Sequence, residues 1–171
     1  MFDTSVYGRF ADDLSLTEKL GRFVPTEYVV YGTKIIRDEL RETPRKIKVN
    51  DASKKILLLK IYDSFVRKDH HDLKENKLVH VLSHDYFKEY KRQKGHLSED
   101  SMRNDLIIIA TATIYQLDIV VSDDERSMLS DAAIKAYDSV NKKYGLKNPT
   151  FKKYSDFKKE VIRRFSRYGT Q

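Results

Sequence analysis

The feature of the sequence that most constrains the fold is a long apolar stretch within residues 103–124. Between Leu106 and Leu117, apolar and small residues recur at the i, i+3, i+4, i+7 spacing of a helix, and the positions between them are hardly polar. This pattern predicts a helix that is buried nearly all round. Residues 119–121, Ile-Val-Val, follow without alternation, which is typical of a strand inside a parallel sheet.

Acidic residues flank this helix and strand. A helix from Asp105 to Leu117 would rise roughly 18 Å, and a strand from Asp118 to Asp124, running antiparallel to it, would return by up to roughly 20 Å. We therefore expect Asp124 to lie level with Asp105, at the edge where open α/β sheets place their binding sites. Two carboxylates held together there repel each other, and a divalent cation relieves that repulsion.

Length and composition narrow the class of protein. At 171 residues, 40% of them hydrophobic, the chain is predicted to form one domain, residues 1–171, with its own core. Lys and Arg outnumber Asp and Glu by 33 to 26, and the resulting net charge of +7 favours polyanionic partners. Neither a membrane-spanning apolar run nor a leader peptide is visible, so we expect a cytoplasmic protein with no membrane partner. The absence of Cys excludes disulfides and thiolate metal ligands.

The rest of the chain alternates short strands with helices. We predict helices at residues 6–11, 15–21, 33–42, 53–67 and 130–145, a last helix capped by Ser155, and strands at 27–31 and 149–151. Residues 78–82 fit either a strand or the start of a helix that continues to residue 93, and Ser98 or Ser101 can cap the central helix. This alternation predicts an α/β fold of three layers, with a short parallel sheet between two layers of helices.

Asp3 is the first acid of the chain. If Phe2 ends a strand, Asp3 lies at the carboxyl tip of that strand, with the hydroxyl groups of Thr4 and Ser5 beside it. Asp is also a favoured N-cap residue, so Asp3 can begin the first helix. The two roles are compatible.

Glu39 lies on the apolar side of the predicted helix at residues 33–42. At about 100° per residue it falls between Ile35 and Ile36. Its carboxylate either extends to solvent from the edge of the apolar stripe or serves a site within the protein. The pattern leaves both alternatives open.

Two basic segments are candidates for contact with a polyanion. Arg45 and Lys46 belong to a loop at residues 44–48, and the last helix carries five cations: Lys158, Lys159, Arg163, Arg164 and Arg167. Such a run is usually the solvated face of an amphipathic helix, and contact with a nucleic-acid backbone is the alternative.

The segment Lys68–Asp72 contains adjacent histidines and resembles that of the DHH phosphoesterases. Adjacent side chains on a regular element diverge, so His70 and His71 are poorly placed to share one metal ion. Because the other acid and His clusters of that family are absent, we interpret this segment as a solvated loop.

Taken in order, the acidic segments resemble those of the PIN domain, the metal-dependent nuclease domain of VapC-type toxins and of several RNA-processing proteins. Residues 3–6, Asp-Thr-Ser-Val, resemble the opening Asp-Thr-Asn-Val of the family, and residues 36–41, Ile-Arg-Asp-Glu-Leu-Arg, resemble its helix with the second acid. Residues 104–112, Asn-Asp-Leu-Ile-Ile-Ile-Ala-Thr-Ala, are similar to its Asp-x-Leu-Ile-x-Ala-x-Ala helix. Residues 120–124, Val-Val-Ser-Asp-Asp, are similar to its Leu-Val-Thr-x-Asp close.

The chain departs from the family pattern in three places. Only two residues precede Asp3, Ser5 stands where the family has Asn, and the segment between Glu39 and Asp105 is long and matches nothing in detail. The short start favours an alternative function, a PIN-like module that binds RNA or a protein without catalysis.

The resemblance implies a set of catalytic and metal-binding acids, namely Asp3, Glu39, Asp105 and Asp124, with Asp123 as the alternative to the last. The residues that it and the basic loop suggest for substrate binding are Thr4, Ser5, Ser122, Arg45 and Lys46. Hard carboxylate oxygens select Mg²⁺ or Mn²⁺ over zinc. One or two such ions would activate water for in-line hydrolysis of RNA, without a protein nucleophile.

The main hypothesis from the sequence is therefore a metal-dependent endoribonuclease with a PIN-like fold. By resemblance it is either the toxin of a VapBC-type pair or an RNA-processing nuclease. A toxin of this kind would have an antitoxin protein as partner, and the resemblance also implies a homodimer.

Overall fold

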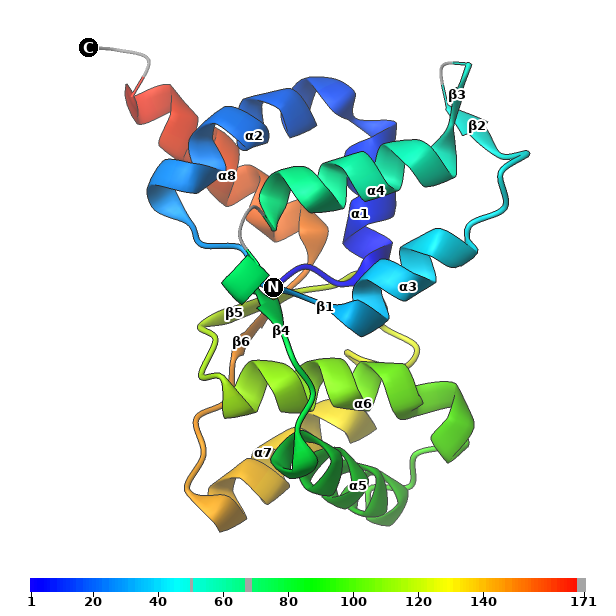
Figure 1. Ribbon diagram of the computed structural model, residues 1–171. Coiled ribbons are helices and arrows are strands. Elements are labelled where there is room, and N and C mark those ends of the chain that lie inside the picture. Colours follow the sequence, from blue (N-terminus) through cyan, green and yellow to red (C-terminus); the bar gives the residue numbers. More distant parts are fainter. Residues whose placement is uncertain (50, 67–68, 169–171) are drawn as a thin grey trace.

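The computed structural model describes residues 1–49, 51–66 and 69–168, and at residues 22–26, 69 and 167–168 it describes the backbone alone. This part of the chain is of mixed α/β class, as predicted, and is mostly helical (Figure 1). Its α-helices are α1 (Thr4–Asp12), α2 (Leu14–Glu27), α3 (Lys34–Glu42), α4 (Lys54–Phe65), α5 (Lys77–Arg92), α6 (Glu99–Ile114), α7 (Asp131–Tyr144) and α8 (Tyr154–Tyr168). The strands are β1 (Gly32–Thr33), β2 (Lys48–Val49), β3 (Ala52–Ser53), β4 (Asp72–Leu73), β5 (Ile119–Val121) and β6 (Thr150–Lys152).

The strands pair mainly in parallel. β1 pairs with β4 and β5 with β6, whereas β2 and β3 form an antiparallel hairpin. Phe2 forms a parallel bridge to Val121, and the Asp3 backbone N–H donates to the Val121 carbonyl at 2.9 Å. β5 therefore lies between residues 1–3 and β6. Within the described residues, hydrogen bonds divide the strands into pairs and do not join them into one continuous sheet.

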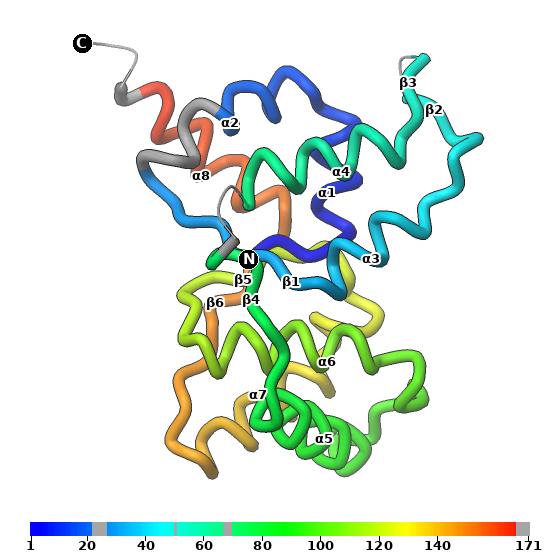
Figure 2. Tube along the Cα trace, viewed as in Figure 1, coloured from blue at the N-terminus to red at the C-terminus, as the bar shows by residue number. Residues whose placement is uncertain are grey.

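The helices form two groups on either side of the short strands. Figure 1 shows α1 to α4 and α8 on one side and α5 to α7 on the other, and the trace in Figure 2 shows the N-terminus between the two groups. The buried apolar residues of both groups belong to one hydrophobic cluster. In the part of the chain that the structure describes, no helix combines the length and apolar character that crossing a membrane requires.

Helix α6 packs against α5 within its group and also contacts α3 of the other group. The predicted burial is confirmed, because every residue from Leu106 to Thr113 is buried. The helix begins earlier than the apolar stretch. Ser98, one of the two predicted caps, accepts a hydrogen bond from the Ser101 backbone N–H at 3.3 Å. Asp105 consequently lies in the second turn of α6, so its predicted place at the amino end of the helix is wrong.

Several predicted boundaries differ from the structure. Helix α2 continues to Glu27, so the strand predicted at residues 27–31 is wrong, and only residues 32–33 pair as β1. Residues 78–82 are helical, β4 occurs where a loop was predicted, and α8 begins one residue before Ser155. Arg67 and Lys68 lie outside the described residues. Strands of two residues are too short for a period-2 pattern to reveal them.

A close contact fixes β1 against α4. A Cβ atom at Gly32 would lie 2.2 Å from the hydroxyl oxygen of Tyr62, so only glycine fits there. That hydroxyl hydrogen-bonds the Thr33 carbonyl at 3.1 Å and the Asp72 carboxylate at 3.0 Å. It thereby ties β1 to β4. Because α3 begins at Lys34, directly after β1, the same contact positions α3.

Candidate acidic site at the carboxyl end of β5

Asp105 is the centre of the candidate site. Burial, the largest cause, and the charges of Asp3, Asp124 and Glu39 together raise the pKa of its carboxyl group to about 7. A hydrogen bond from Ser127 opposes these effects. The four predicted acids come from four separate segments of the chain. The structure places three of them close enough to act on the ionisation of the fourth.

Ser127 connects two of these acids. Its hydroxyl donates to the Asp105 carboxylate and lies 2.5 Å from Oδ2 of Asp124. Because both carboxylate oxygens contact the same hydroxyl, they are at most roughly 6 Å apart. A hydroxyl has one proton and can satisfy only one of two ionised carboxylates. When Asp105 retains its proton, its carboxyl group can donate to the Ser127 oxygen, and the Ser127 proton is then left for Asp124. The sequence analysis did not identify Ser127.

Asp3 is held by hydroxyl groups on both sides. Its Oδ2 accepts from the hydroxyl of Ser122 at 2.9 Å and from that of Ser5 at 2.8 Å, and the residue is 5% exposed. Both predicted roles occur together, because Asp3 follows the bridged residue Phe2 and also caps α1. The hydroxyl of Ser122 in turn accepts from the backbone N–H of Asp124 at 3.0 Å. Ser122 therefore links the first acid to the last.

Glu39 is directed towards other residues of the site. The Thr4 hydroxyl donates to its Oε2, and the side-chain amide of Asn104 donates to its Oε1 at 2.6 Å. Asn104 immediately precedes Asp105 on α6. Of the two alternatives left open by the sequence, the structure therefore shows the carboxylate engaged within the protein, at the junction of α1, α3 and α6.

The loop after β5 separates Asp123 from Asp124. Asp123 accepts from the Arg9 guanidinium at 2.9 Å and from the Tyr154 backbone N–H at 3.0 Å. Asp124 contacts Ser127, and its Oδ1 accepts from the backbone N–H groups of residues 126 and 127, both at 2.9 Å. Asp123 is thus engaged by a cation outside the cluster, whereas Asp124 belongs to it.

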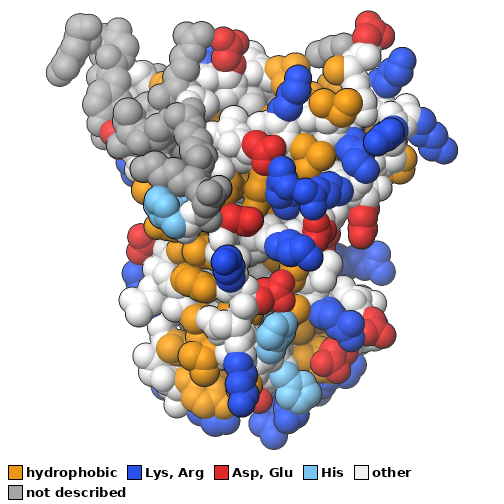
Figure 3. Space-filling model, viewed as in Figure 1, with side chains coloured by type: hydrophobic (Ala, Val, Ile, Leu, Met, Phe, Trp, Pro, Cys, Tyr) orange, Lys and Arg blue, Asp and Glu red, His pale blue; other side chains and the backbone are white. Residues whose placement is uncertain are grey.

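The basic loop is exposed, between α3 and β2. Figure 3 shows Lys and Arg side chains gathered over α3, α4 and the β2–β3 hairpin on the same part of the surface. Within the described residues, the side chains of Arg45 and Lys46 make no hydrogen bond or ion pair. They remain available to an anionic partner but do not contact the acids.

Three cations of α8 form ion pairs within the chain, whereas Arg163 forms none among the described residues. Lys158 contacts Asp13 at 2.6 Å, and Arg164 contacts Glu160 at 2.9 Å. Lys159 lies 3.5 Å from an acid one turn away on the same helix. The side chain of Arg167 lies outside the described residues. The basic loop is therefore better suited than α8 to contact a nucleic acid.

The chemistry of the donors fits a hard divalent cation. All four acids offer carboxylate oxygens, and the raised pKa of Asp105 reflects in part the repulsion that a cation relieves. Within the residues that the structure describes, no three His, Asp or Glu side chains form a ready group of metal ligands. The acids instead meet through hydroxyl groups, and their side chains would have to move for them to share an ion.

Two buried tyrosines adjoin the acids. The hydroxyl groups of Tyr7 and Tyr137 have no hydrogen-bond partner among the described residues, although both side chains are fully buried. Burial raises the pKa of Tyr137, and the charge of Asp105 raises it further. Burial likewise raises the pKa of Tyr7, followed by the effects of Tyr62 and Asp3. Both hydroxyl groups are hydrogen-bond donors close to the acidic cluster. The sequence analysis identified neither tyrosine, and Tyr137 shares the apolar side of α7.

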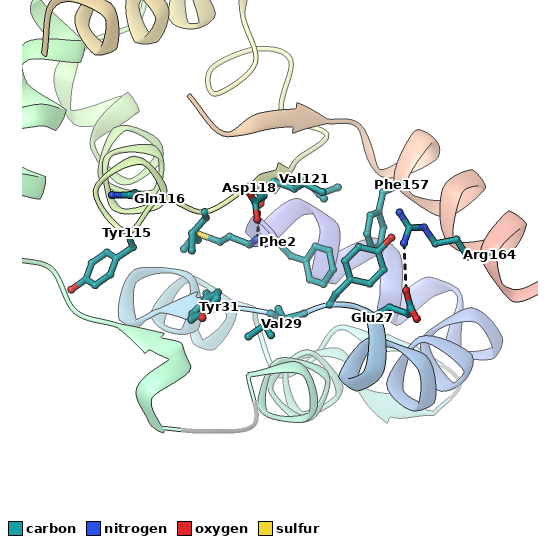
Figure 4. A pocket seen from close by; sticks show the side chains of 15 residues that line it. Phe2, Glu27, Val29, Tyr31, Tyr115, Gln116, Asp118, Val121, Phe157 and Arg164 are labelled. Carbon is teal, nitrogen blue, oxygen red and sulfur yellow. Dashed lines mark hydrogen bonds and ion pairs between the residues drawn. The ribbon is translucent and has the colours of Figure 1, made fainter. Parts of the chain in front are cut away.

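A cavity of about 530 Å³ lies at the other end of β5 (Figure 4), and none of the predicted acids lines it. There the Met1 amino group donates to the Ile119 carbonyl at 2.8 Å, and burial lowers the pKa of that amino group to about 5. Arg164 lies 3.5 Å from Glu27 and 5.4 Å from the ring centre of Tyr28. At this end of β5, Arg164 is therefore paired with a carboxylate.

Comparisons of the chain with protein-family models, with curated proteins and with solved structures found no significant match. The arrangement of acids, hydroxyl groups and cations is therefore the basis for any inference about function.

Proposed function

We propose that this protein is a Mg²⁺- or Mn²⁺-dependent endoribonuclease. The observation that carries the proposal is the convergence of Asp3, Glu39 and Asp124 on Asp105, whose pKa burial and these charges raise to about 7. Gathering like charges in a partly buried place destabilises a protein, and such clusters are characteristic of functional sites. The net charge of +7 supports a polyanionic substrate.

The proposal includes a PIN-like fold with three layers. In its favour, β1 pairs in parallel with β4, and residues 1–3, β5 and β6 pair in parallel with one another. Asp3 is the last residue of the segment 1–3, and Asp124 follows β5. The helix that carries Asp105 packs beside them (Figure 1).

In this mechanism the four acids would hold the metal, which supplies Lewis acidity and lowers the pKa of a bound water. Ser127 holds Asp105 and Asp124 together. Hydroxyl groups orient the first acid, and Thr4 with Asn104 orients Glu39. Asp105 retains a proton up to about pH 7, so cation binding below that pH would release the proton from its carboxyl group.

The biological setting belongs to the same proposal. A VapC-like toxin would require an antitoxin that covers the acids, and by resemblance it would act as a homodimer. An RNA-processing nuclease would need no such inhibitor. Isolation of the native complex distinguishes the two.

The first experiment is a Mn²⁺ titration by calorimetry, together with RNA cleavage in Mn²⁺, on the intact protein and on Asp105→Asn. We expect saturable binding and cleavage in the intact protein, and loss of both in the variant with an unchanged circular dichroism spectrum. Asp118→Asn is a matched control, because this aspartate is 84% exposed and lies at the other end of β5. Full cleavage by Asp105→Asn would overturn the proposal. RNA binding that persists in EDTA, with no cleavage of any RNA, would instead indicate the non-catalytic module.

A further inference from the structure

A second cavity, of about 610 Å³, adjoins the loop that carries Asp124. It is lined by residues 93–97 between α5 and α6, by Arg126 and by the first turn of α7. Three of its side chains are cations, namely Lys94, Arg126 and Lys135. All three are exposed, and within the described residues their side chains form no ion pair or hydrogen bond. They differ in this from the paired cations of α8.

The cavity and the acids share one loop. Arg126 follows Asp124 by two residues, so their Cα atoms are at most about 7.6 Å apart. The Arg126 backbone N–H donates to Asp124 Oδ1 at 2.9 Å. Ser130, which caps α7 and lines the cavity, donates to the Ser127 carbonyl at 2.9 Å. A ligand seated in the cavity would therefore lie beside the acidic cluster.

The far wall of the cavity is held in place by Tyr90. A Cβ atom at Gly95 would lie 2.1 Å from the Tyr90 ring, and the hydroxyl of that ring accepts from the Leu97 backbone N–H at 3.2 Å. Lys94 adopts a left-handed backbone with φ of 63°. A residue other than glycine is disfavoured there. The surrounding contacts impose this conformation, which determines where the Lys94 side chain leaves the loop.

The charge of the cavity suits a phosphate group. Its lining includes three cations and one carboxylate, that of Asp131, together with His96. Lys and Arg are the usual ligands of phosphate, and the amino end of α7 adds the positive end of a helix dipole. We propose that this cavity binds a backbone phosphate of the RNA strand whose scissile bond lies over the acids. This inference rests on the proposed function, because it takes the ligand to be a strand that continues into the acidic site.

The test measures RNA binding in EDTA, where the proposed cleavage cannot occur. Fluorescence anisotropy would follow a short labelled single-stranded RNA over a range of salt concentrations. The test variant is Arg126→Gln/Lys135→Gln. The matched control is Lys142→Gln/Lys143→Gln, which removes two charges from the far end of the same helix. If each cavity side chain contacts one phosphate, the slope of log affinity against log salt falls by about 1.4, or about 25-fold in affinity near 0.1 M salt.

The outcomes separate this inference from the proposed function. A loss confined to the cavity variant supports the inference. Equal effects of both double variants, or no effect of either, would overturn it, whatever Asp105→Asn shows about cleavage. Calorimetry with inorganic phosphate forms the second arm. Phosphate binding that the cavity variant loses, with RNA binding unaffected, would assign the cavity to a small free anion and overturn the RNA inference.

Discussion

The two ends of β5 differ in the contacts that their charged side chains make. At the amino end, Arg164 pairs with Glu160 and Glu27, and aromatic side chains complete the cavity wall. At the carboxyl end, the charges of three acids act on Asp105, whose pKa is raised mainly by burial. The nearby cation Arg9 contacts Asp123, outside the cluster.

This difference shows which interactions the chain uses to hold its acids. Within the described residues, the carboxylates of the cluster are contacted by hydroxyl, amide and backbone N–H groups. Such groups orient a carboxylate but leave its charge in place. Ion pairs, used along α8, would cancel that charge. The acidic end therefore keeps negative charge without a cation to balance it, at the expense of the free energy of folding.

The largest expected effect is on the stability of the metal-free protein. Asp105→Asn should raise the free energy of unfolding at pH 8 by up to about 4 kcal/mol, because the pKa moves from 3.8 to about 7 on folding. Below pH 3.8 the carboxyl is protonated in both states and its contribution to stability is fully present. That contribution is lost as pH rises to about 7.

Urea unfolding at several pH values, compared between the two proteins, measures this effect. The Met1 amino group, whose pKa falls from 8.0 to about 5 on folding, acts in the opposite sense between those values. The Met1 amino group is present in both proteins, so its effect cancels in the difference between their free energies of unfolding. A variant no more stable than the intact protein at pH 8 would show that Asp105 is not destabilising.

Binding of Mn²⁺ should make the carboxyl end of β5, which destabilises the metal-free protein, a source of stability. A ligand bound only by the folded state stabilises it by about 2.7 kcal/mol at a hundred times its dissociation constant. We expect the unfolding temperature of the intact protein and of Arg164→Gln to rise by an amount that corresponds to this stabilisation. It should be absent in Asp105→Asn and Asp124→Asn. A shift of equal size in all four proteins would place the cation elsewhere.

Removing one hydroxyl group tests how the acids are held. Ser127→Ala should lower the free energy of unfolding at pH 8 by about 1–2 kcal/mol. It should also move the pKa of Asp105 further above its present value of about 7, because the hydrogen bond from Ser127 lowers it. Carboxyl-carbon NMR would follow the titration. Ser127→Thr keeps the hydroxyl and serves as the control, and an unchanged pKa in the alanine variant would contradict this role.

The smallest effect is expected at the amino end of β5. Arg164 is 40% exposed, so Arg164→Gln should cost less than about 1 kcal/mol of stability. The loss should shrink in high salt, which screens exposed ion pairs. Urea unfolding at low and high salt measures both. A larger and salt-independent loss would mean that the cavity in Figure 4 depends on this side chain for packing.

The sequence was most informative where one element is buried throughout. The run from Leu106 to Thr113 predicted α6, and the run at residues 119–121 predicted β5, because burial on all sides leaves an uninterrupted apolar signal. Strands of two residues leave no such signal, so the sequence predicts a strand at residues 27–31 in place of β1 and a loop in place of β4. The sequence pattern does not locate the start of α6, because its first two turns are mostly polar and exposed, with Met102 buried among them.

The four acids were named from their order along the chain, but their supports were not. Ser127 acts through a turn in which Asp124 accepts from the backbone N–H groups two and three residues later. An Asp followed by Ser at this spacing is a weak sign of such a turn, and it could have directed attention to Ser127. The choice between Asp123 and Asp124 depends on Arg9, which is distant in sequence. Side chains brought together from separate segments also form the cationic cavity.

Gly32 shows how mutational tolerance can depend on a residue with no chemistry of its own. Any side chain there would displace the Tyr62 hydroxyl from Thr33 and Asp72, and α3 begins two residues later. Glu39 would move with that helix. In a saturation screen scored by RNA cleavage, position 32 should therefore be as intolerant of replacement as the acids. Selection on catalysis would then preserve a glycine that lies seven residues from the nearest acid of the site.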